Sequence, residues 1–354
     1  MPAISANGGI RTKVVRARSP LRLGLAGGGT DLSPFCDEYG GAVLNATIGR
    51  YAHASVTFTG DDKVVLRADD IEQTETVGKH ELTLEGPLAL HRGVAARMTR
   101  DFLGGKPVGL TLGTMIDAPP GSGLGSSSAL VVAMVEAFRV ALDLPLGRYD
   151  VAHLAYEIER KDLGLSGGRQ DQYASAFGGI NFIEFLSEDR VIVNPLRLPS
   201  ALLSELQASL VICFTGQSRA SHDIISTQIS RISERHGSAV GATMQLKEDA
   251  FEMKRALLRG DFASMAVVLN RSWLAKKETA TGISNELIER LWTLGMSNGA
   301  TGGKVSGAGG GGFLMFLTDP SNRAHLMRAL KEAGGEPSTV NFSHEGVEGW
   351  EASF

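Results

Sequence analysis

Cysteine is scarce in this chain of 354 residues, which contains only Cys36 and Cys213. Two cysteines so far apart exclude a disulfide scaffold and a cysteine-rich zinc site, and they fit a reducing compartment. The eight histidines are scattered and show no H-x-x-E-H spacing, so we expect no histidine metal site. Thiol and zinc chemistry are therefore not expected.

Long apolar runs and an excess of positive charge are also missing. No apolar run is long enough to cross a bilayer, and residues 1–13 lack the apolar core of a signal peptide. We interpret residues 1–12 as a loose leader and expect a cytoplasmic protein with no membrane partner. The net charge of −4 argues against a nucleic-acid partner, because nucleic-acid-binding proteins usually carry a basic excess.

Three common nucleotide-binding signatures are absent from the sequence. A Walker loop requires G-x-x-x-x-G-K-[ST], but Lys304 is followed by Val305 and no glycine precedes Gly303 by five residues. The pattern G-x-G-x-x-G occurs at residues 307–312, but a strand is expected after it where a Rossmann fold requires a helix. The H-R-D and D-F-G triplets of protein kinases are missing.

Glycine, by contrast, is abundant: its 44 copies gather in three segments, at residues 27–29, 121–125 and 302–312. The middle segment leads into three serines, residues 126–128, and then into an apolar run. Glycines make an open turn, and serine commonly caps a helix. The first N–H groups of a helix have no internal partner and carry partial positive charge, so they can receive a phosphate. The segment predicts a phosphate loop or, taken alone, a capped helix after a flexible loop.

The remaining pattern predicts helices and strands in two domains. The length suggests two domains, and the 43% of hydrophobic residues can build sizeable cores. We place the domains at residues 1–200 and 201–354. Because the first half shows no βαβ repeat, the expected class is α+β. Strands are expected at residues 14–26, 42–58, 63–68, 108–116, 180–185, 191–193, 209–214, 313–317 and 338–342, and helices at 88–103, 126–142, 149–163, from 169, mostly over 215–298, and at 322–333.

Polar residues suited to an active site accompany the glycine segments. Arg22 lies on the first expected strand, and Asp31 follows a glycine turn. Glu157 and Glu159 are two positions apart on an expected helix, so at most one of them faces a given site. Asp171 lies where a short helix begins. The carboxylates also have ordinary structural explanations as turn residues, solvated side chains or helix caps.

Taken together, these segments resemble the GHMP kinases, the family of galactokinase, homoserine kinase, mevalonate kinase and phosphomevalonate kinase. Three family motifs match in the expected order, at residues 20–31, 120–129 and 304–313, and residues 168–172 carry a Gly-x-x-Asp-Gln segment. The resemblance covers nearly the whole chain. It implies an N-terminal α/β domain like one in a ribosomal protein, a ferredoxin-like C-terminal domain, and ATP in the cleft.

The resemblance also implies roles for individual residues. Asp171 is the expected catalytic aspartate, and Arg22 is the arginine that assists it. Ser127 and Glu159 are the expected Mg²⁺ ligands, with Glu157 in reserve. Phosphoryl transfer requires positioning, a metal at the phosphates and cations where charge develops, which these residue types can supply. The ATP phosphates are expected on Gly121, Ser122, Gly123, Leu124, Gly125, Ser126, Ser127 and Ser128.

Within the family, residues 27–31 and 168–172 look most like the heptose 7-phosphate kinases. Those enzymes phosphorylate the anomeric hydroxyl of D-glycero-D-manno-heptose 7-phosphate, on the route to nucleotide-activated heptose for bacterial surface polysaccharide. Gly28 and Gly29 stand where galactokinases have an acidic residue and a histidine, which argues against galactose. A phosphorylated acceptor requires a second basic subsite. The expected acceptor-binding residues are Gly28, Gly29, Thr30, Asp31, Arg169, Gln170, Lys304, Gly309 and Gly310, with Arg169 and Lys304 the candidates for the phosphate.

Two alternatives stay open. The acceptor could be another sugar, such as fucose or mannose, because the motifs specify the phosphate machinery more tightly than the acceptor. The fold could also serve a catalytically silent sugar-sensing regulator, which would tolerate the loss of Asp171, Glu159 or Ser127. Competent side chains at all three positions favour an enzyme. The expected ligands are a sugar phosphate and ATP, and a homo-oligomer stays open.

Overall fold

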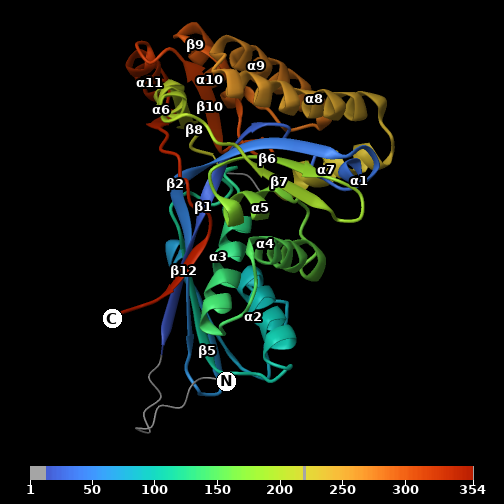
Figure 1. The fold of residues 1–354 in the computed structure, drawn as a ribbon, viewed down its shortest axis with the longest axis vertical. Helices are drawn as coiled ribbons and strands as arrows, with labels where there is room; N and C mark the ends of the chain where they lie inside the picture. Colours follow the sequence, from blue (N-terminus) through green and yellow to red (C-terminus); the bar gives the residue numbers. More distant parts are fainter. Residues whose placement is uncertain (1–12, 218–220, 354) are drawn as a thin grey trace.

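The computed structural model describes residues 13–217 and 221–353, which form two β-sheets with helices packed against them (Figure 1). Residues 1–12, interpreted above as a loose leader, lie outside the described residues. The mixture of mostly antiparallel sheets and helices confirms the α+β class. None of the described helices combines the length and apolarity needed to span a membrane.

The first sheet is built mainly from the first half of the chain. Its strand order is β12-β1-β2-β5-β3-β4, while β6 pairs with β2 and β7 pairs with β6. Strand β2 is long enough to pair with β6 along residues 41–46 and with β5 along residues 52–58. The strands are β1 (Val14–Ala26), β2 (Gly41–Phe58), β3 (Lys63–Ala68), β4 (Gln73–Gly78), β5 (Leu110–Ile116), β6 (Ile180–Phe185), β7 (Val191–Pro195) and β12 (Glu348–Glu351).

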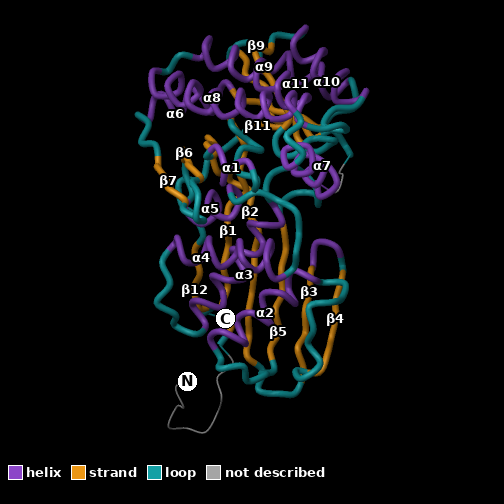
Figure 2. Tube along the Cα trace, turned by 90° about the vertical axis from the view of Figure 1, so that its right-hand side faces the viewer, coloured by secondary structure: helices purple, strands orange, loops and turns teal. Residues whose placement is uncertain are grey.

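Helices cover one face of this sheet, as Figure 2 shows for α2, α3 and α4 in front of the long strands. Helix α3 is the central one, and all of its residues from 128 to 138 are buried. A helix buried all round reads as an almost uninterrupted apolar run, which is why this segment is easy to predict. The helices of the first half of the chain are α1 (Phe35–Tyr39), η1 (Asp69–Ile71), α2 (Ala89–Phe102), α3 (Ser126–Ala141), α4 (Arg148–Tyr156), the π-helix η2 (Glu157–Asp162) and α5 (Gln170–Phe177).

The second sheet takes its strands from beyond residue 200, in the order β11-β8-β10-β9. Helices separate β8 from β9 and β10 from β11, which gives the β-α-β-β-α-β arrangement of a ferredoxin-like fold and confirms that prediction. The strands are β8 (Leu210–Phe214), β9 (Ala300–Val305), β10 (Phe313–Thr318) and β11 (Glu336–Thr339). The helices are α6 (Ser200–Ser209), α7 (Ser221–Ser233), α8 (Gly237–Arg259), α9 (Phe262–Thr279), α10 (Glu286–Ser297) and α11 (Arg323–Glu332).

Strand β10 is buried on both faces and therefore reads as a continuous apolar run. Its residues Phe313, Met315 and Leu317 belong to the large core shared with the first half of the chain. The alternate residues Leu314 and Phe316 belong to a smaller core within the second half. Side chains on a strand alternate between faces, so the second sheet is packed against apolar side chains on both sides.

Strand β1 changes character along its length, and this change positions the site. Buried and partly exposed residues alternate up to Ser19, and every residue from Ser19 to Ala26 is buried. The register with β2 shifts between Pro20 and Leu21, where proline cannot donate to the ladder. Arg22 therefore lies on the fully covered half of the strand.

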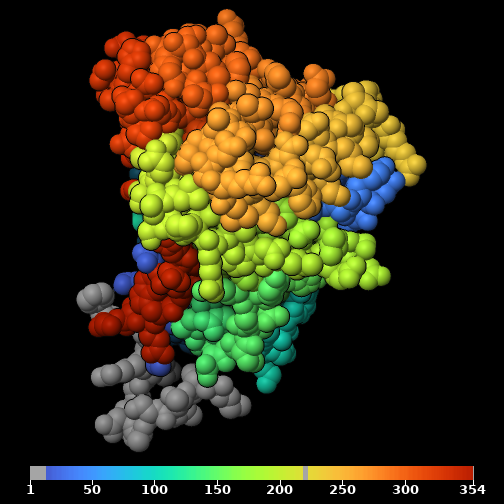
Figure 3. Space-filling model, turned by 45° about the horizontal axis from the view of Figure 1, so that its top comes forward, coloured from blue at the N-terminus to red at the C-terminus, as the bar shows by residue number. Residues whose placement is uncertain are grey.

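The end of the chain returns to the first sheet. Strand β12 pairs antiparallel with β1 from Val15 to Arg18. In Figure 3 the last residues, coloured red, lie against the lower, first half of the molecule. The proposed division at residue 200 thus separates the strands of the two sheets except for β12, and it stays a prediction.

Several elements differ from the sequence-based expectation. The helix expected over residues 149–163 ends at Tyr156 and continues as the π-helix η2. Helix α6 and strands β4, β9 and β12 were not expected, and β11 begins and ends earlier than residues 338–342. Strand β9 lies within a glycine-rich segment, and its glycines allow a neighbouring backbone to approach closely. A Cβ on Gly302 would meet the backbone of Ala266 at 2.7 Å.

Candidate active site

A cleft of about 340 Å³ opens between the two halves of the chain, and all three glycine segments of the sequence line it. The first half contributes β1, the turn after β1, the loop before α3, η2 and the start of α5. The second half contributes α7, α8, α9, β9 and the loop after β9. Residues far apart in the sequence therefore share one cavity.

The loop before α3 lines this cleft with Gly121, Gly123 and Gly125. Gly121, Gly123 and Gly125 adopt φ values of 69°, 76° and 74°, a region that glycine enters without strain. Gly125 is the N-cap of α3, so no side chain caps the first turn. The serine cap considered from the sequence is therefore absent. The first N–H groups of α3 remain available to an anion, and the helix dipole favours one there.

Carbonyl groups of the same loop accept hydrogen bonds from other parts of the protein. The carbonyl of Gly123 accepts from Nη1 of Arg22 at 2.7 Å, and that of Leu124 accepts from the Arg22 backbone N–H at 3.0 Å. The carbonyl of Ser122 accepts from the N–H of Phe313 at 3.1 Å. Because donors on β1 and β10 occupy these acceptors, the loop is fixed against both strands.

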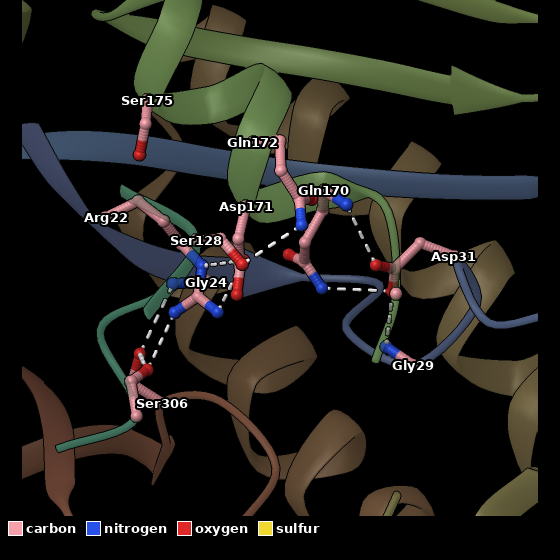
Figure 4. A network of polar contacts seen from close by, with 12 residues as sticks. Arg22, Gly24, Gly29, Asp31, Ser128, Gln170, Asp171, Gln172, Ser175 and Ser306 are labelled. Atoms are coloured by element: carbon pink, nitrogen blue, oxygen red, sulfur yellow. Dashed lines mark hydrogen bonds and ion pairs between the residues drawn. The ribbon is translucent and has the colours of Figure 1, made fainter. Parts of the chain in front are cut away.

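Asp171 and Arg22 meet at the floor of the cleft (Figure 4). Nε of Arg22 donates to Oδ1 of Asp171 at 2.7 Å, and Nη2 lies 2.6 Å from the same oxygen. The Arg22 side chain is 5% exposed and that of Asp171 is 20% exposed, so the carboxylate retains access to the cleft. A Cβ on Gly125 would lie 3.1 Å from Cγ of Asp171, so the glycine lets the phosphate loop pack against this carboxylate.

Asp31 lies beside Gln170 at the start of α5 and is 1% exposed. It accepts hydrogen bonds from the backbone N–H and Nε2 of Gln170, both at 3.0 Å, and from the N–H of Gly29 at 3.2 Å (Figure 4). Burial, followed by the nearby charge of Asp171, raises the pKa of Asp31, while the backbone hydrogen bonds oppose the rise. These three hydrogen bonds hold the Asp31 carboxylate in one orientation at the edge of the cleft.

Glu159 forms a separate cluster with the serines of α3. Its Oε1 accepts from the hydroxyl of Ser127 at 2.7 Å, and its Oε2 accepts from Ser128 and from Nε2 of Gln172, both at 2.7 Å. Glu159 is 2% exposed, whereas Ser127 is exposed to the cleft. One carboxylate and a hydroxyl beside a phosphate-binding loop suit Mg²⁺, which binds few protein ligands together with phosphate oxygens.

Comparison with known proteins places this arrangement in a family. The model described as "GHMP kinases N terminal domain" matches residues 89–179, and "GHMP kinases C terminal" matches residues 253–336. A protein of Campylobacter jejuni named D-glycero-alpha-D-manno-heptose 7-phosphate kinase is 44% identical over 339 residues, covering 96% of this chain and 99% of that protein. The chain belongs to the GHMP kinase family. It is a phosphotransferase of the kind that takes its phosphate from ATP.

Two further relatives agree with this membership. A crystal structure of a D-glycero-D-manno-heptose 1-phosphate kinase from Bacteroides thetaiotaomicron matches with a TM-score of 0.81 and 40% identity, over 96% of this chain and all of that one. A bifunctional fucokinase/GDP-fucose pyrophosphorylase of Arabidopsis thaliana is 28% identical over 92% of this chain, which spans 32% of that larger protein.

This GHMP kinase carries two buried lysines in the cleft. Nζ of Lys276, on α9, donates to the carbonyl of Gly28 at 3.2 Å, and Nζ of Lys304, on β9, donates to that of Gly24 at 2.9 Å. Burial lowers the pKa of Lys276 to about 8, and burial followed by the charges of Lys276 and Arg22 lowers the pKa of Lys304 to about 7.

Lys276 and Arg160 are cleft residues that the motifs do not indicate. The pair Lys276-Lys277 reads as a solvated end of α9. However, Lys276 follows buried Leu269 by seven positions and buried Trp273 by three, which places it on the inner face of the helix. Arg160 follows Glu159 and donates from Nη2 to the hydroxyl of Ser128 at 3.3 Å. The helical periodicity of α9 predicts that Lys276 faces inward. The direction of Arg160 could not be predicted in this way, because Arg160 lies in the π-helix η2.

The guanidinium of Arg169, the candidate acceptor-phosphate residue, is engaged by other protein groups, and its role in phosphate binding stays a prediction. Its Nη2 lies 2.8 Å from Asp37 and 3.0 Å from Asp189, and its guanidinium lies over the ring of Tyr156. It is absent from the cleft lining, whereas its neighbour Gln170 is present. Two carboxylates and an aromatic ring compensate the burial of Arg169 on the far side of the segment.

Other expected ligand residues have structural partners instead. The hydroxyl of Thr30 donates to the carbonyl of Ala42 at 2.9 Å and accepts from the N–H of Ala42 at 3.0 Å. Ala42 therefore uses this hydroxyl both as donor and as acceptor. Gly309 and Gly310 pack against Ile283, and the N–H of Gly310 donates to that carbonyl at 2.7 Å. None of these three expected residues lines the cleft, which instead contains Gly307 and Ala308 of that loop.

The reserve metal ligand Glu157 also lies elsewhere. It pairs with Nη2 of Arg97 at 2.6 Å and with Nζ of Lys161 at 3.4 Å, on the outer side of η2. As the two-residue spacing predicted, only one of the two glutamates faces the site. The remaining expected residues lining the cleft are Arg22, Gly28, Gly29, Asp31, Gly121, Gly123, Gly125, Ser126, Ser127, Ser128, Glu159, Gln170, Asp171 and Lys304.

Proposed function

We propose that this GHMP kinase transfers the γ-phosphate of ATP to the anomeric hydroxyl of D-glycero-D-manno-heptose 7-phosphate. The observation that carries the proposal is the 44% identity, over almost the full length of both chains, to a protein named as a kinase of that heptose 7-phosphate. The glycines at positions 28 and 29 support it, because they leave the acceptor side of the cleft without the acidic residue and histidine of galactokinases.

The acceptor is proposed to lie between Asp171 and Asp31. Asp171 accepts the proton of the anomeric hydroxyl as its oxygen bonds to the γ-phosphorus, and the bond from that phosphorus to the leaving ADP oxygen breaks. Arg22 holds the carboxylate in place and faces the charge that develops on the transferring group. Asp31, fixed by Gln170 and Gly29, accepts hydrogen bonds from sugar hydroxyls.

The donor is proposed to lie with its phosphates on the N-terminus of α3. The N–H groups of Ser126, Ser127 and Ser128 and the flanking glycines receive phosphate oxygens there. Ser127 and Glu159 would hold Mg²⁺, which would neutralise negative charge on the phosphate oxygens. Ser128 and Gln172 keep the Glu159 carboxylate turned toward the Ser127 hydroxyl.

The wider setting follows from the proposed substrate. A sugar 1-phosphate made inside the cell serves nucleotide-activated heptose for surface polysaccharide, so we place the enzyme in the cytoplasm.

Product analysis by ³¹P NMR tests the proposal. The enzyme is mixed with ATP, Mg²⁺ and the heptose 7-phosphate, and a new anomeric phosphate signal beside the retained 7-phosphate signal is expected. Fucose and mannose are the comparison acceptors, because a fucokinase is among the relatives. Turnover of a free hexose without turnover of the heptose phosphate would reject the proposed acceptor and keep the kinase. No turnover of any sugar would favour a sugar-sensing regulator.

A further inference from the structure

Lys276 and Lys304 are buried cations for which the proposed transfer step has no use. Each is 6% exposed, and each ammonium donates one hydrogen bond to a backbone carbonyl. An ammonium has three N–H donors, so two on each lysine are left for a ligand. Within residues 13–217 and 221–353, neither lysine has a carboxylate at ion-pair distance.

The two ammonium groups also lie close enough to disfavour each other. The charge of Lys276 is, after burial, the largest influence lowering the pKa of Lys304. Arg22 adds to the effect on both lysines, but its own charge is matched by Asp171. Asp31 acts in the opposite direction on the pKa of Lys276, and Asp249 does so on that of Lys304, but neither carboxylate lies at ion-pair distance from its lysine. Buried charges are normally paired, so both lysines lack a directly paired anion among the described residues. A bound anion would supply the missing partner.

The place of Lys276 identifies which ligand brings that anion. Lys276 contacts the turn that carries Asp31, since its Nζ would lie 3.0 Å from a Cβ on Gly29. A Cβ on Gly28 would meet only Nε2 of Gln170, at 3.9 Å. Two glycines thus leave space between an amide donor and an ammonium, on the acceptor side of the cleft.

The donor phosphates have their own binding groups elsewhere. The N-terminus of α3 and the Ser127–Glu159 pair come from the first half of the chain, whereas both lysines come from the second half. We propose that Lys276 and Lys304 bind the phosphate that the acceptor already carries, and that they thereby select a phosphorylated sugar over a free one. The inference rests on the proposed function and replaces Arg169 as the expected phosphate ligand.

Steady-state kinetics of Lys276→Met and Lys304→Met test this role. Methionine keeps the length of the side chain without its charge. For each variant, KM for the heptose 7-phosphate should rise about 10- to 100-fold, the effect of losing one charge-assisted hydrogen bond. KM for ATP and kcat/KM for the unphosphorylated heptose should change less than about threefold, because those complexes lack the acceptor phosphate.

Lys277→Met is the matched control. Lys277 is the next residue on α9, but it pairs with Glu289 at 3.1 Å outside the cleft. Its kinetics should equal those of the wild type with both acceptors. Equal losses for phosphorylated and unphosphorylated heptose in the cleft variants, or a raised KM for ATP, would assign the lysines to the transferred phosphate and overturn the inference.

A measurement on the wild-type enzyme tests the same role without relying on the folding of a variant. Inorganic phosphate should inhibit competitively against the heptose 7-phosphate. Inhibition competitive with ATP alone would place the anion on the phosphate loop and contradict the proposal. If the wild type prefers free hexoses, both the proposed function and this inference fail. If it prefers the heptose phosphate and the lysine variants keep that preference, only this inference fails.

Discussion

Nε of Arg22 donates to Oδ1 of Asp171 at 2.7 Å, although 149 positions separate the two residues in the chain. The same guanidinium donates from Nη1 to the carbonyl of Gly123 at 2.7 Å. One side chain on β1 therefore links the carboxylate at the start of α5 with the loop before α3. This link fixes the distance between the proposed proton acceptor and the proposed phosphate site, and in-line transfer depends on that distance.

Asp171→Asn should abolish most of the turnover while keeping this geometry. The amide has the shape of the carboxylate but cannot accept the proton, so we expect kcat to fall about 1,000-fold. Nucleotide binding, measured by titration calorimetry, should stay within about threefold of the wild type, because the substitution leaves the proposed phosphate site at α3 unchanged. Unchanged turnover would remove Asp171 from the mechanism.

Ser127→Ala and Ser128→Ala should separate metal binding from structural support. Ser127 is exposed to the cleft, so its loss should raise the Mg²⁺ concentration for half-maximal activity about tenfold. Ser128 is 2% exposed and bonds Glu159, Gln172 and Arg160, so its loss should lower the free energy of unfolding by about 1–3 kcal/mol. Magnesium titrations and denaturant melts of both variants check this. Equal Mg²⁺ requirements for Ser127→Ala and the wild type would contradict a ligand role.

Gly168→Ala should damage the acceptor site alone. A Cβ at this position would overlap the carboxylate of Asp31, which must then move. Since a shift of about 1 Å can cost about 100-fold in rate, kcat/KM for the acceptor should fall by that order while KM for ATP stays constant. Gly241→Ala, where a Cβ meets nothing within 4 Å, is the control. Full activity of Gly168→Ala would show that the position of Asp31 is not critical.

Much of the fold could be predicted because buried faces of strands and helices produce a periodic pattern of apolar residues in the sequence. Strands β1 and β3 have the predicted bounds, and the apolar run after residue 128 becomes the buried helix α3. Glycine hides structure, however. The sequence predicts a loop where strand β9 forms, because Gly302 and Gly303 carry no side chains that could show an alternating pattern. Its pairing with β10 depends on contacts that local sequence does not contain.

The backbone positions that form the site could be predicted from the spacing of the motifs. The direction in which each side chain points was harder to predict. Arg169 and Gln170 are adjacent, yet Gln170 bonds Asp31 while Arg169 bonds Asp37. Nothing local distinguishes them, because the choice depends on the carboxylates that fold against each side. Lys276 reaches the cleft because α9 packs against the turn after β1, and 248 positions separate Lys276 from Gly28, the residue it bonds in that turn.

The two cleft lysines should make ligand binding depend on pH. Their pKa values in the folded chain, about 8 and about 7, lie below the ordinary 10.5. Between pH 7 and 10.5 the unfolded chain therefore holds more protons on these residues, and their contribution to stability rises with pH. A bound phosphate would reverse the shift by pairing with the ammonium groups.

Binding of the heptose 7-phosphate at pH 8 should accordingly take up about one proton, because the phosphate itself is already ionised there. Titration calorimetry in HEPES and in Tris measures the uptake, since the two buffers release protons with different enthalpies. Lys304→Met should lose part of the uptake, and Lys277→Met should retain all of it. Identical binding enthalpies in the two buffers would mean that the lysines do not change protonation, and hence that the phosphate does not reach them.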